Sequence, residues 1–429
     1  MNASWKIAVF LAALLFGSPV LSHDDFGPPP IDPVRSWNQL ALQTVRIKSA
    51  SDAQAARLYA MVNAAMYDAV NGIVPLREHA IVPSFGAAFG NRYAAAAAAA
   101  HAVLAGEYPD QKVLLYDPQL ASDLAALPPG GVTTAGRNWG AQVGAAVRTA
   151  RADDGSTPNE TQPAGSGPGV FRAAWSGVQF RNLLPFGIAS SAPYVGAGQP
   201  ALTSLDYAAT FAEVKVIGSA ANVDAGKLAT FQFWSLGGGT SQPPGAWMQV
   251  AIAVTDEHPL PLASKTRLFA LVSIALADTV APTVMTKFTF RHWRPATAIR
   301  EGDLDGNPLT DVDAAWSPRA GGIGTSPEYW SGHSSFSAAG AAALAGFYCA
   351  DNISFTLLTD SAPGAVARTY PSFSAAAKEA GVSRVLGGIH FNNAGNEHGL
   401  AAGRAIAQEI LANKLLLRLG PTHFGECPR

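Results

Sequence analysis

The sequence contains few charged residues and only two cysteines, and both scarcities exclude classes of protein. Charged side chains make up 14% of the 429 residues, and 29 basic residues nearly balance 31 acidic ones. A nucleic-acid-binding protein would need a basic excess that is missing here. Hydrophobic residues reach 48%, which excludes a disordered chain. The composition therefore predicts a globular protein with a large buried core.

The two cysteines, Cys349 and Cys427, do not have the spacing of a metal site or of a redox pair. An oxidising compartment would permit a disulfide between them. The sequence leaves open whether they lie close enough to pair.

The N-terminus has the pattern of an export signal. Lys6 supplies a positive charge, residues 7–16 form an apolar run, and Val20 and Ser22 fit a cleavage site. A membrane anchor is the alternative, but the apolar run is short for a spanning helix. We therefore expect a signal peptide over residues 1–22 and a periplasmic or secreted mature protein.

Long alternating runs typical of a sheet are absent, whereas helical periodicity is frequent. Helices are predicted at 52–73, 91–108, 206–219, 265–288, 333–349 and 399–420. Asp52 is the expected N-cap of the first, and Gly72 its expected stop. We therefore predict an all-α fold of packed helical bundles. Residues 23–200 would form an N-terminal helical half with a Pro/Gly-rich leader and an excursion over 153–199. Residues 201–429 would form a C-terminal half that carries the site.

The segment 268–285 is apolar enough to suggest a membrane span. Asp278 and Pro282 interrupt it, and its flanks are amphipathic. A buried core helix is the better interpretation, so the protein is not expected to be an integral membrane protein.

A cationic stretch, "KFTFRHWRPATAIR", contains Lys287 and Arg294 but no acidic residue. Residues seven positions apart lie on nearly the same face of a helix, so both side chains could reach one point. A solvated cationic face is the simpler explanation. However, the interleaved Phe288, Phe290 and Trp293 indicate burial, and buried cations require an anion from elsewhere.

Two later stretches contain further candidates. In "WSGHSSFSAAGAAAL", Ser331, Gly332 and His333 stand at the head of a predicted helix, where free N–H groups favour an anion. A capping turn alone would also explain them. In "SRVLGGIHF", Arg384 offers a planar fork for oxyanions, and His390 could equally be a core histidine.

The order and spacing of these stretches, Lys-x6-Arg-Pro, Ser-Gly-His and Ser-Arg-x5-His, resemble the signature of vanadium-dependent haloperoxidases and type 2 phosphatidic-acid-phosphatase-like enzymes. "FRHWRP", "SGHSSFSAAGA" and "SRVLGGIHF" resemble the haloperoxidase branch more closely. The N-terminal "WNQLALQTVR" and "MVNAAMYDAVNGI" support the same resemblance, which spans most of the mature chain.

The resemblance implies a role for each motif residue. The residues that would hold vanadate are hydrogen-bond donors to its oxygens and one ligand to the metal. They are Lys287, Arg294, Ser331, Gly332, Arg384 and His390. His390 would bind vanadium, and His333 would transfer protons. His333, His390 and Lys287 would be the catalytic residues.

The implied function is a secreted vanadate-dependent haloperoxidase that oxidises halide with hydrogen peroxide to hypohalous acid-type products, with or without a small organic acceptor. One alternative is a metal-free acid phosphatase with a phosphohistidine at His390, and another is a non-catalytic oxyanion-binding protein. In the phosphatases an Asp often follows the histidine by four residues, where this chain has Ala394, which favours the peroxidase. Trp330 replaces the family's usual Pro. Ser326 is a candidate neighbour of the halide.

Overall fold

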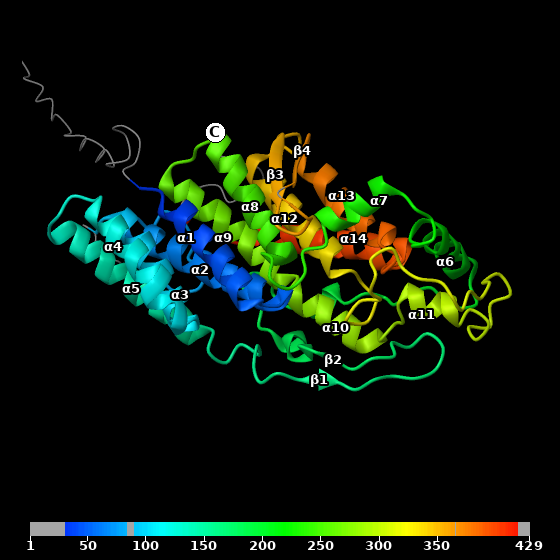
Figure 1. Ribbon diagram of the computed structural model, residues 1–429. Coiled ribbons are helices and arrows are strands. Elements are labelled where there is room, and N and C mark those ends of the chain that lie inside the picture. The colour runs from blue at the N-terminus through cyan, green and yellow to red at the C-terminus, as the bar shows by residue number, and fades with distance from the viewer. Residues whose placement is uncertain (1–30, 84–89, 365, 419–429) are drawn as a thin grey trace, which may run out of the picture.

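Helices dominate the computed structural model of the protein, which describes residues 31–83, 90–364 and 366–418 (Figure 1). The predicted all-α class is therefore confirmed. The signal-peptide residues 1–22 and Cys427 lie outside the described residues, so export and the disulfide stay predictions. The α-helices are α1 (Pro33–Lys48), α2 (Asp52–Ile73), α3 (Arg92–Glu107), α4 (Asp117–Ala125), α5 (Gly131–Ala150), α6 (Leu205–Ile217), α7 (Ala225–Phe233), α8 (Gln242–Glu257), α9 (Leu262–Asp278), α10 (Val280–Phe290), α11 (Pro295–Arg300), α12 (Gly332–Tyr348), α13 (Phe373–Leu386) and α14 (His398–Asn413).

The helices α1 to α5 lie together at one end of the molecule, and α6, α7, α11 and α13 lie toward the other (Figure 1). Buried residues of α2, α9 and α12 belong to one large hydrophobic core, whereas α6 and α11 pack in a second, smaller cluster. The helical stretch Leu262–Phe290, formed by α9 and α10, is apolar and long enough to cross a membrane, yet most of it is buried inside the protein. Its burial fits the expected core helix.

The start of α2 differs from the prediction. Ser51, not Asp52, is the N-cap: its side chain accepts the Gln54 N–H, and the Gln54 side chain accepts the Ser51 N–H in return. This reciprocal pair satisfies two main-chain donors of the first turn. Asp52 is instead the first helical residue, and Gly72 lies one residue before the helix ends at Ile73.

Small residues allow the helices to approach closely. A Cβ on Gly140 of α5 would lie 2.0 Å from the Ala95 main-chain oxygen of α3. In the same way, a Cβ on Gly403 of α14 would lie 2.0 Å from the Ser335 main-chain oxygen of α12. The abundant Ala and Gly are therefore a requirement of close helix–helix packing.

The predicted excursion contains no α-helix between α5 and α6 within the described residues. It includes the antiparallel pair β1 (Thr161–Gln162) and β2 (Trp175–Ser176) and then runs along α10 (Figure 1). Phe171, Trp175 and Val178 pack there against Phe288. The excursion thus covers the helix that carries Lys287.

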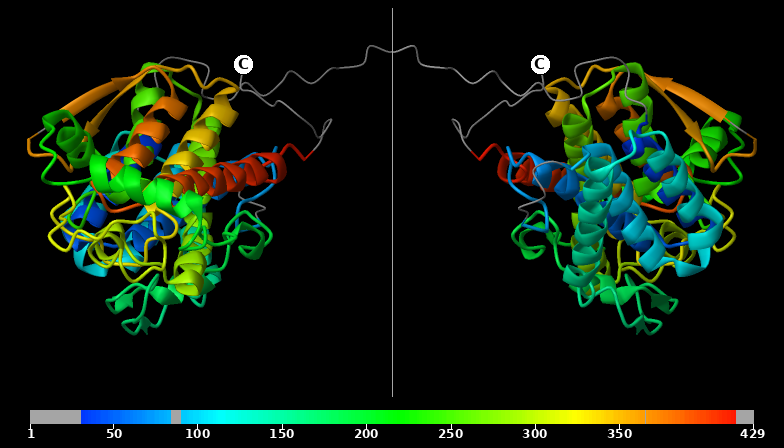
Figure 2. Two further views of the ribbon diagram at one scale, coloured as in Figure 1. Left: turned by 90° about the vertical axis from the view of Figure 1, so that its right-hand side faces the viewer. Right: turned by 90° about the vertical axis from the view of Figure 1, so that its left-hand side faces the viewer.

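A second antiparallel pair, β3 (Phe355–Thr359) and β4 (Val366–Tyr370), was not predicted. In β3, Phe355, Leu357 and Thr359 are buried and alternate with exposed residues. Five residues are too short a run to distinguish from a loop by periodicity. The two strand pairs lie at separate edges of the molecule (Figure 2), so neither changes the helical class.

The close contact at Gly403 gives a test of the packing. Gly to Ala normally stabilises a helix interior by about 1 kcal/mol. Here we expect Gly403→Ala to lower the free energy of unfolding by about 2 kcal/mol, because the new methyl group would overlap the main chain of α12. Chemical denaturation would measure the change, with Ala405→Ser at an exposed position of α14 as control. Unchanged or raised stability of Gly403→Ala would contradict this account.

Candidate active site

The predicted site residues come from separate segments that converge on one buried region. Lys287 lies in the last turn of α10, Arg294 directly before α11, and Ser331 to His333 at the start of α12. Arg384 lies in the last turn of α13, and His390 follows that helix. The positive charges of Arg294, Lys287 and Arg384 all act on the pKa of His390, which shows that these groups are neighbours. We call these seven residues the oxyanion cluster.

Lys287 and Arg294 do not share a helix face, contrary to the prediction. The helix α10 ends at Phe290, and Arg291 takes a left-handed conformation with φ of 50°. Arg294 is extended, because a residue that precedes proline is disfavoured in the helical region. The turn between α10 and α11, rather than helical spacing, therefore brings the two cations together.

Main-chain carbonyls are the hydrogen-bond partners of the three cations. Lys287 Nζ donates to the carbonyls of Pro327 and Glu328. Arg294 donates through Nε to Ser326 O at 2.8 Å and through Nη1 to Ile389 O at 2.6 Å.

Arg384 Nη1 donates to Trp234 O at 3.1 Å, whereas its buried Nε has no partner among the described residues. Carbonyls orient these groups without neutralising their charge. The unpaired Nε is a donor available to a ligand.

The cluster therefore holds more positive than negative charge in a buried setting. Lys287, Arg294 and Arg384 are 6%, 5% and 5% exposed. Burial lowers the pKa of Arg294 to about 10, and burial together with Arg294 lowers the pKa of Arg384 to about 9. Burial and Arg294 also lower the pKa of Lys287. A bound oxyanion would offset this excess, which the motif pattern predicts.

The head of α12 is arranged as expected. Ser331 is the N-cap, and its Oγ accepts the Ser334 N–H at 3.2 Å, which leaves its own O–H free to donate. Gly332 is the first helical residue, and its N–H is one of the donors that a helix leaves unpaired. This end of the helix therefore offers a hydroxyl and an N–H to an anion.

His333 is held beside Arg384. Its Nε2 lies 2.9 Å from Ser235 O, and the carbonyl of the preceding residue binds Arg384. A carbonyl can only accept, so Nε2 carries the proton and Nδ1 is left as an acceptor. Burial and Arg384 lower the pKa of His333 well below its usual range. His333 is thus a neutral imidazole that can take up a proton.

Hydrogen bonds at both ring nitrogens hold His390 in place. Its Nδ1 lies 2.9 Å from Glu328 Oε1, and its Nε2 lies 3.0 Å from Arg294 Nη1. The guanidinium can only donate, so Nε2 carries a lone pair and Nδ1–H donates to Glu328. Burial and the neighbouring cations lower the pKa of His390 well below its usual range. A neutral imidazole with a bare Nε2 suits a metal ligand.

Glu328 is the site residue that the sequence analysis missed. It is fully buried, and besides His390 it accepts the Phe391 N–H at 3.0 Å and Gln199 Nε2 at 2.9 Å. Burial raises its pKa to about 7, and Arg294 and Lys287 oppose that rise. The signal was its position five residues before His333, in "PEYWSGH". Only the folded chain shows that it reaches His390.

Glu328 also corrects the inference drawn from Ala394. A Cβ on Gly395 would lie 1.8 Å from Glu328 Oε1, so the small residues there leave the space that Glu328 occupies. The carboxylate that orients His390 therefore comes from the segment before α12 rather than from position 394. Ala394 no longer distinguishes a peroxidase from a phosphatase.

The short segment 326–331, which we call the template loop, contacts most of the oxyanion cluster. Its carbonyls bind Arg294 and Lys287, and its Glu328 side chain binds His390. Ser331 closes the loop by capping α12, and its N–H donates to Gly395 O at 2.7 Å. The loop thus sets the relative positions of residues far apart in the sequence.

Other residues near the motifs pack rather than bind. Trp330 is buried beside Tyr329, and its Nε1 donates to Thr283 Oγ1 at 3.0 Å. His292 is buried against Tyr207 and Phe391, and burial lowers its pKa to about 3. His292 is therefore a packing residue of the aromatic cluster beside the site.

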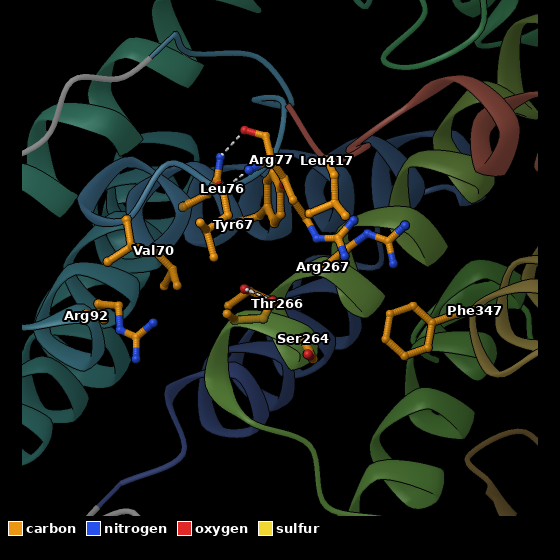
Figure 3. Close-up of a pocket in the computed structure, with 13 residues that line it drawn as sticks. Tyr67, Val70, Leu76, Arg77, Arg92, Ser264, Thr266, Arg267, Phe347 and Leu417 are labelled. Carbon is orange, nitrogen blue, oxygen red and sulfur yellow. Dashed lines mark hydrogen bonds between the residues drawn. The ribbon is translucent and has the colours of Figure 1, made fainter. Parts of the chain in front are cut away.

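A separate cavity of about 460 Å³ lies between α2, α9 and the C-terminal segment (Figure 3). None of the oxyanion cluster lines it. Arg77 and Arg267 reach it from different elements and both donate to Leu415 O. This cavity therefore belongs to the anchoring of the C-terminal segment and not to the candidate site.

Comparison with known proteins relates the fold of this chain to solved structures. Residues 267–416 match the family model of the VCPO second helical-bundle domain. A bacterial vanadium-dependent iodoperoxidase is similar in structure, with a TM-score of 0.75 and 21% identity over 91% of this chain and 99% of that chain.

Two structures of a bacterial vanadium-dependent chloroperoxidase, in holo and apo form, give TM-scores of 0.62 and 0.63 at 16% identity. They cover 84% and 83% of this chain and 92% and 91% of theirs. No curated protein matches the chain in sequence. Residues 267–416 thus match a VCPO second helical-bundle domain, and the chain shares the fold of the bacterial vanadium-dependent haloperoxidases, the family that its motifs resemble.

Proposed function

We propose that the protein is a vanadate-dependent haloperoxidase that oxidises halide with hydrogen peroxide. The observation that carries the proposal is the excess of buried positive charge on Lys287, Arg294 and Arg384, beside a histidine whose Nε2 carries no proton. Such a set of groups fits a tetrahedral or five-coordinate oxyanion that also takes one nitrogen ligand.

The donors fit vanadate in number and kind. Its oxygens would be held by the cations, the Ser331 hydroxyl, the Gly332 N–H and the unpaired Arg384 Nε, and His390 Nε2 would bind vanadium. Vanadate in this cluster would supply a Lewis-acid centre that activates hydrogen peroxide for attack by halide.

Side chains of the protein would stabilise charge, move protons and orient the metal ligand. The cations stabilise negative charge on the bound oxygens, because their carbonyl contacts already hold them in place. His333 Nδ1 accepts the proton that peroxide loses on binding. Glu328 keeps the proton of His390 on Nδ1 and so keeps Nε2 available.

An acid phosphatase would use the same oriented His390 as its nucleophile, and Glu328 serves that chemistry equally well. The similarity to iodo- and chloroperoxidases favours the peroxidase. Hydrolysis of p-nitrophenyl phosphate without vanadate, in a protein that oxidises no halide, would reverse this preference.

We also propose that the protein is exported, on the pattern of residues 1–22. A periplasmic or extracellular enzyme would release its oxidant outside the cytoplasm. N-terminal sequencing of the mature protein would test this, with cleavage expected near Ser22.

Anion binding can be tested without any assay of activity. Orthovanadate at 100 times its Kd should stabilise the protein by about 2.7 kcal/mol and raise Tm by a few degrees. Lys287→Met removes one cation and should reduce this shift strongly. Lys378→Met, an exposed lysine on α13, is the control and should keep it. Equal shifts in both variants would contradict the assigned role of Lys287.

The role of His390 is tested by its removal. Vanadate-dependent oxidation of iodide or bromide should fall by about 100-fold or more in His390→Ala, since the nitrogen ligand is lost. His258→Ala changes an exposed histidine at the end of α8 and should be harmless. Unchanged halide oxidation in His390→Ala would sink the proposed function.

The contact between Glu328 and His390 predicts a tautomer. In ¹⁵N-histidine-labelled protein at neutral pH, His390 should be neutral and protonated at Nδ1. Glu328→Gln keeps an acceptor and should preserve that tautomer, whereas Glu328→Leu removes the acceptor and should shift the proton toward Nε2. Identical ¹⁵N spectra for the two variants would show that Glu328 does not set the tautomer.

A further inference from the structure

One carboxylate beside the oxyanion cluster has no part in the function described above. Asp52 was expected to cap α2, but Ser51 and Gln54 already form the complete cap. Asp52 Oδ1 accepts the N–H of Ala53 at 2.8 Å. Its Oδ2 has no hydrogen-bond partner within the described part of the chain. The Asp52 carboxyl group therefore does not cap α2, which is the role that the sequence pattern predicted for it.

The free oxygen of Asp52 faces the head of α12. A Cβ built on Gly332 would lie 3.6 Å from Asp52 Oδ2, which is ordinary van der Waals contact. The adjacent N–H of Gly332 is one of the donors proposed for the bound oxyanion. The positive charge of Lys287, on α10, acts to lower the pKa of the Asp52 carboxyl, so Asp52 lies close to the oxyanion cluster. The helix α2 thus brings an acid from the N-terminal half to the site.

Asp52 is also partly accessible, unlike Glu328. Its residue is half-buried, as is His333, whereas Glu328 is fully buried. Burial raises the pKa of Asp52 above its usual value, and the Ala53 N–H and Lys287 limit the rise. An acid with these properties can hold a proton near the site and regain one from solvent.

The proposed reaction consumes one proton beyond those that peroxide brings, and neither histidine of the cluster is suited to supply it. Halide, hydrogen peroxide and one proton yield hypohalous acid and water. The peroxide O–O bond breaks, a halogen–oxygen bond forms, and halide loses two electrons to peroxide. His333 is neutral before peroxide binds, with its Nε2–H engaged by Ser235 O, so it can return only the proton that it takes from peroxide. The Nδ1 proton of His390 is engaged by Glu328.

We infer that the Asp52 carboxyl is the proton donor of this site. It gives its proton to the oxygen that leaves as water when the O–O bond breaks, and the carboxylate is reprotonated from solvent. Lys287 of α10 is the charged group of the site that acts on this carboxyl. The inference rests on the proposed function and adds a residue from the N-terminal half to it.

Asp52→Asn is the discriminating variant, because the amide keeps an oxygen for the Ala53 N–H and loses only the acid. An anion bound beside Asp52 raises the pKa of the carboxyl, so the wild-type protein should take up protons, up to about one per anion, as it binds orthovanadate or inorganic phosphate near neutral pH. Calorimetric titrations in buffers of different ionisation enthalpy measure this uptake. Asp52→Asn should take up fewer protons and bind the anion no more weakly.

Activity supplies the second readout. In Asp52→Asn, kcat for halide oxidation should fall by about 100-fold at neutral pH, and the fall in kcat toward alkaline pH that we expect for the wild type should disappear. Asp52→Glu should recover part of kcat. Ser51→Ala removes the cap of the same helix and should lower Tm while it leaves kcat unchanged, which separates proton donation from local stability.

Each result has one meaning. Equal proton uptake and equal pH profiles in wild type and Asp52→Asn, with halide oxidation intact, would overturn the role of Asp52 alone. A wild-type protein that oxidises no halide with vanadate would overturn the proposed function, and the inference with it. Lower uptake in Asp52→Asn, together with loss of the alkaline dependence, would establish Asp52 as the donor.

Discussion

Burying three positive charges with too little negative charge beside them is the constraint on which the site depends. A single fully buried carboxylate, Glu328, lies close to Lys287 and Arg294, and it accepts hydrogen bonds from His390, Phe391 and Gln199. Carbonyl dipoles hold the cations without cancelling their charge. Desolvated charge of this kind is costly unless an anion completes it. The anion binding proposed for this chain would offset that excess of charge before any chemistry takes place.

The scaffold that tolerates this cost is built from small residues. Alanines and glycines let α12 and α14 approach until Gly403 touches the main chain at Ser335, one turn into the helix that begins at Ser331. The same closeness joins α3 to α5. Tight packing leaves the start of α12 little freedom to move, so its N–H groups keep one direction. The abundance of Ala and Gly in the sequence is therefore what holds the N–H donors of α12 in place.

The sequence predicted those parts of the structure that depend on near neighbours along the chain. The six predicted helices, the cap at Ser331 and the three motifs follow from local patterns, and the structure contains helix in each predicted range. The helix expected to reach residue 420 ends at Asn413, and helices such as α1, α5 and α8 were not predicted. The shared helix face of Lys287 and Arg294 was wrong, although Pro295 was visible and disfavours a helical residue before it.

Contacts between positions far apart in the sequence could not be predicted from local patterns. Glu328 is 62 residues from His390, and Asp52 reaches Gly332 from the other half of the chain. Both carboxyl groups lie outside the motifs, in segments that read as a turn and as a helix start. Hydrophobic periodicity predicts which face of a helix is buried, and motif spacing predicts local turns. Neither predicts which loop packs against which histidine.

The template loop has a consequence for how this site can vary. Residues 326–331 supply the carbonyls for two cations, the carboxylate for the histidine and the cap for α12. No one of these contacts can shift without moving the others, since they share one stretch of main chain. The loop and the small pair Ala394–Gly395 would therefore be inherited, exchanged or engineered as one module rather than residue by residue.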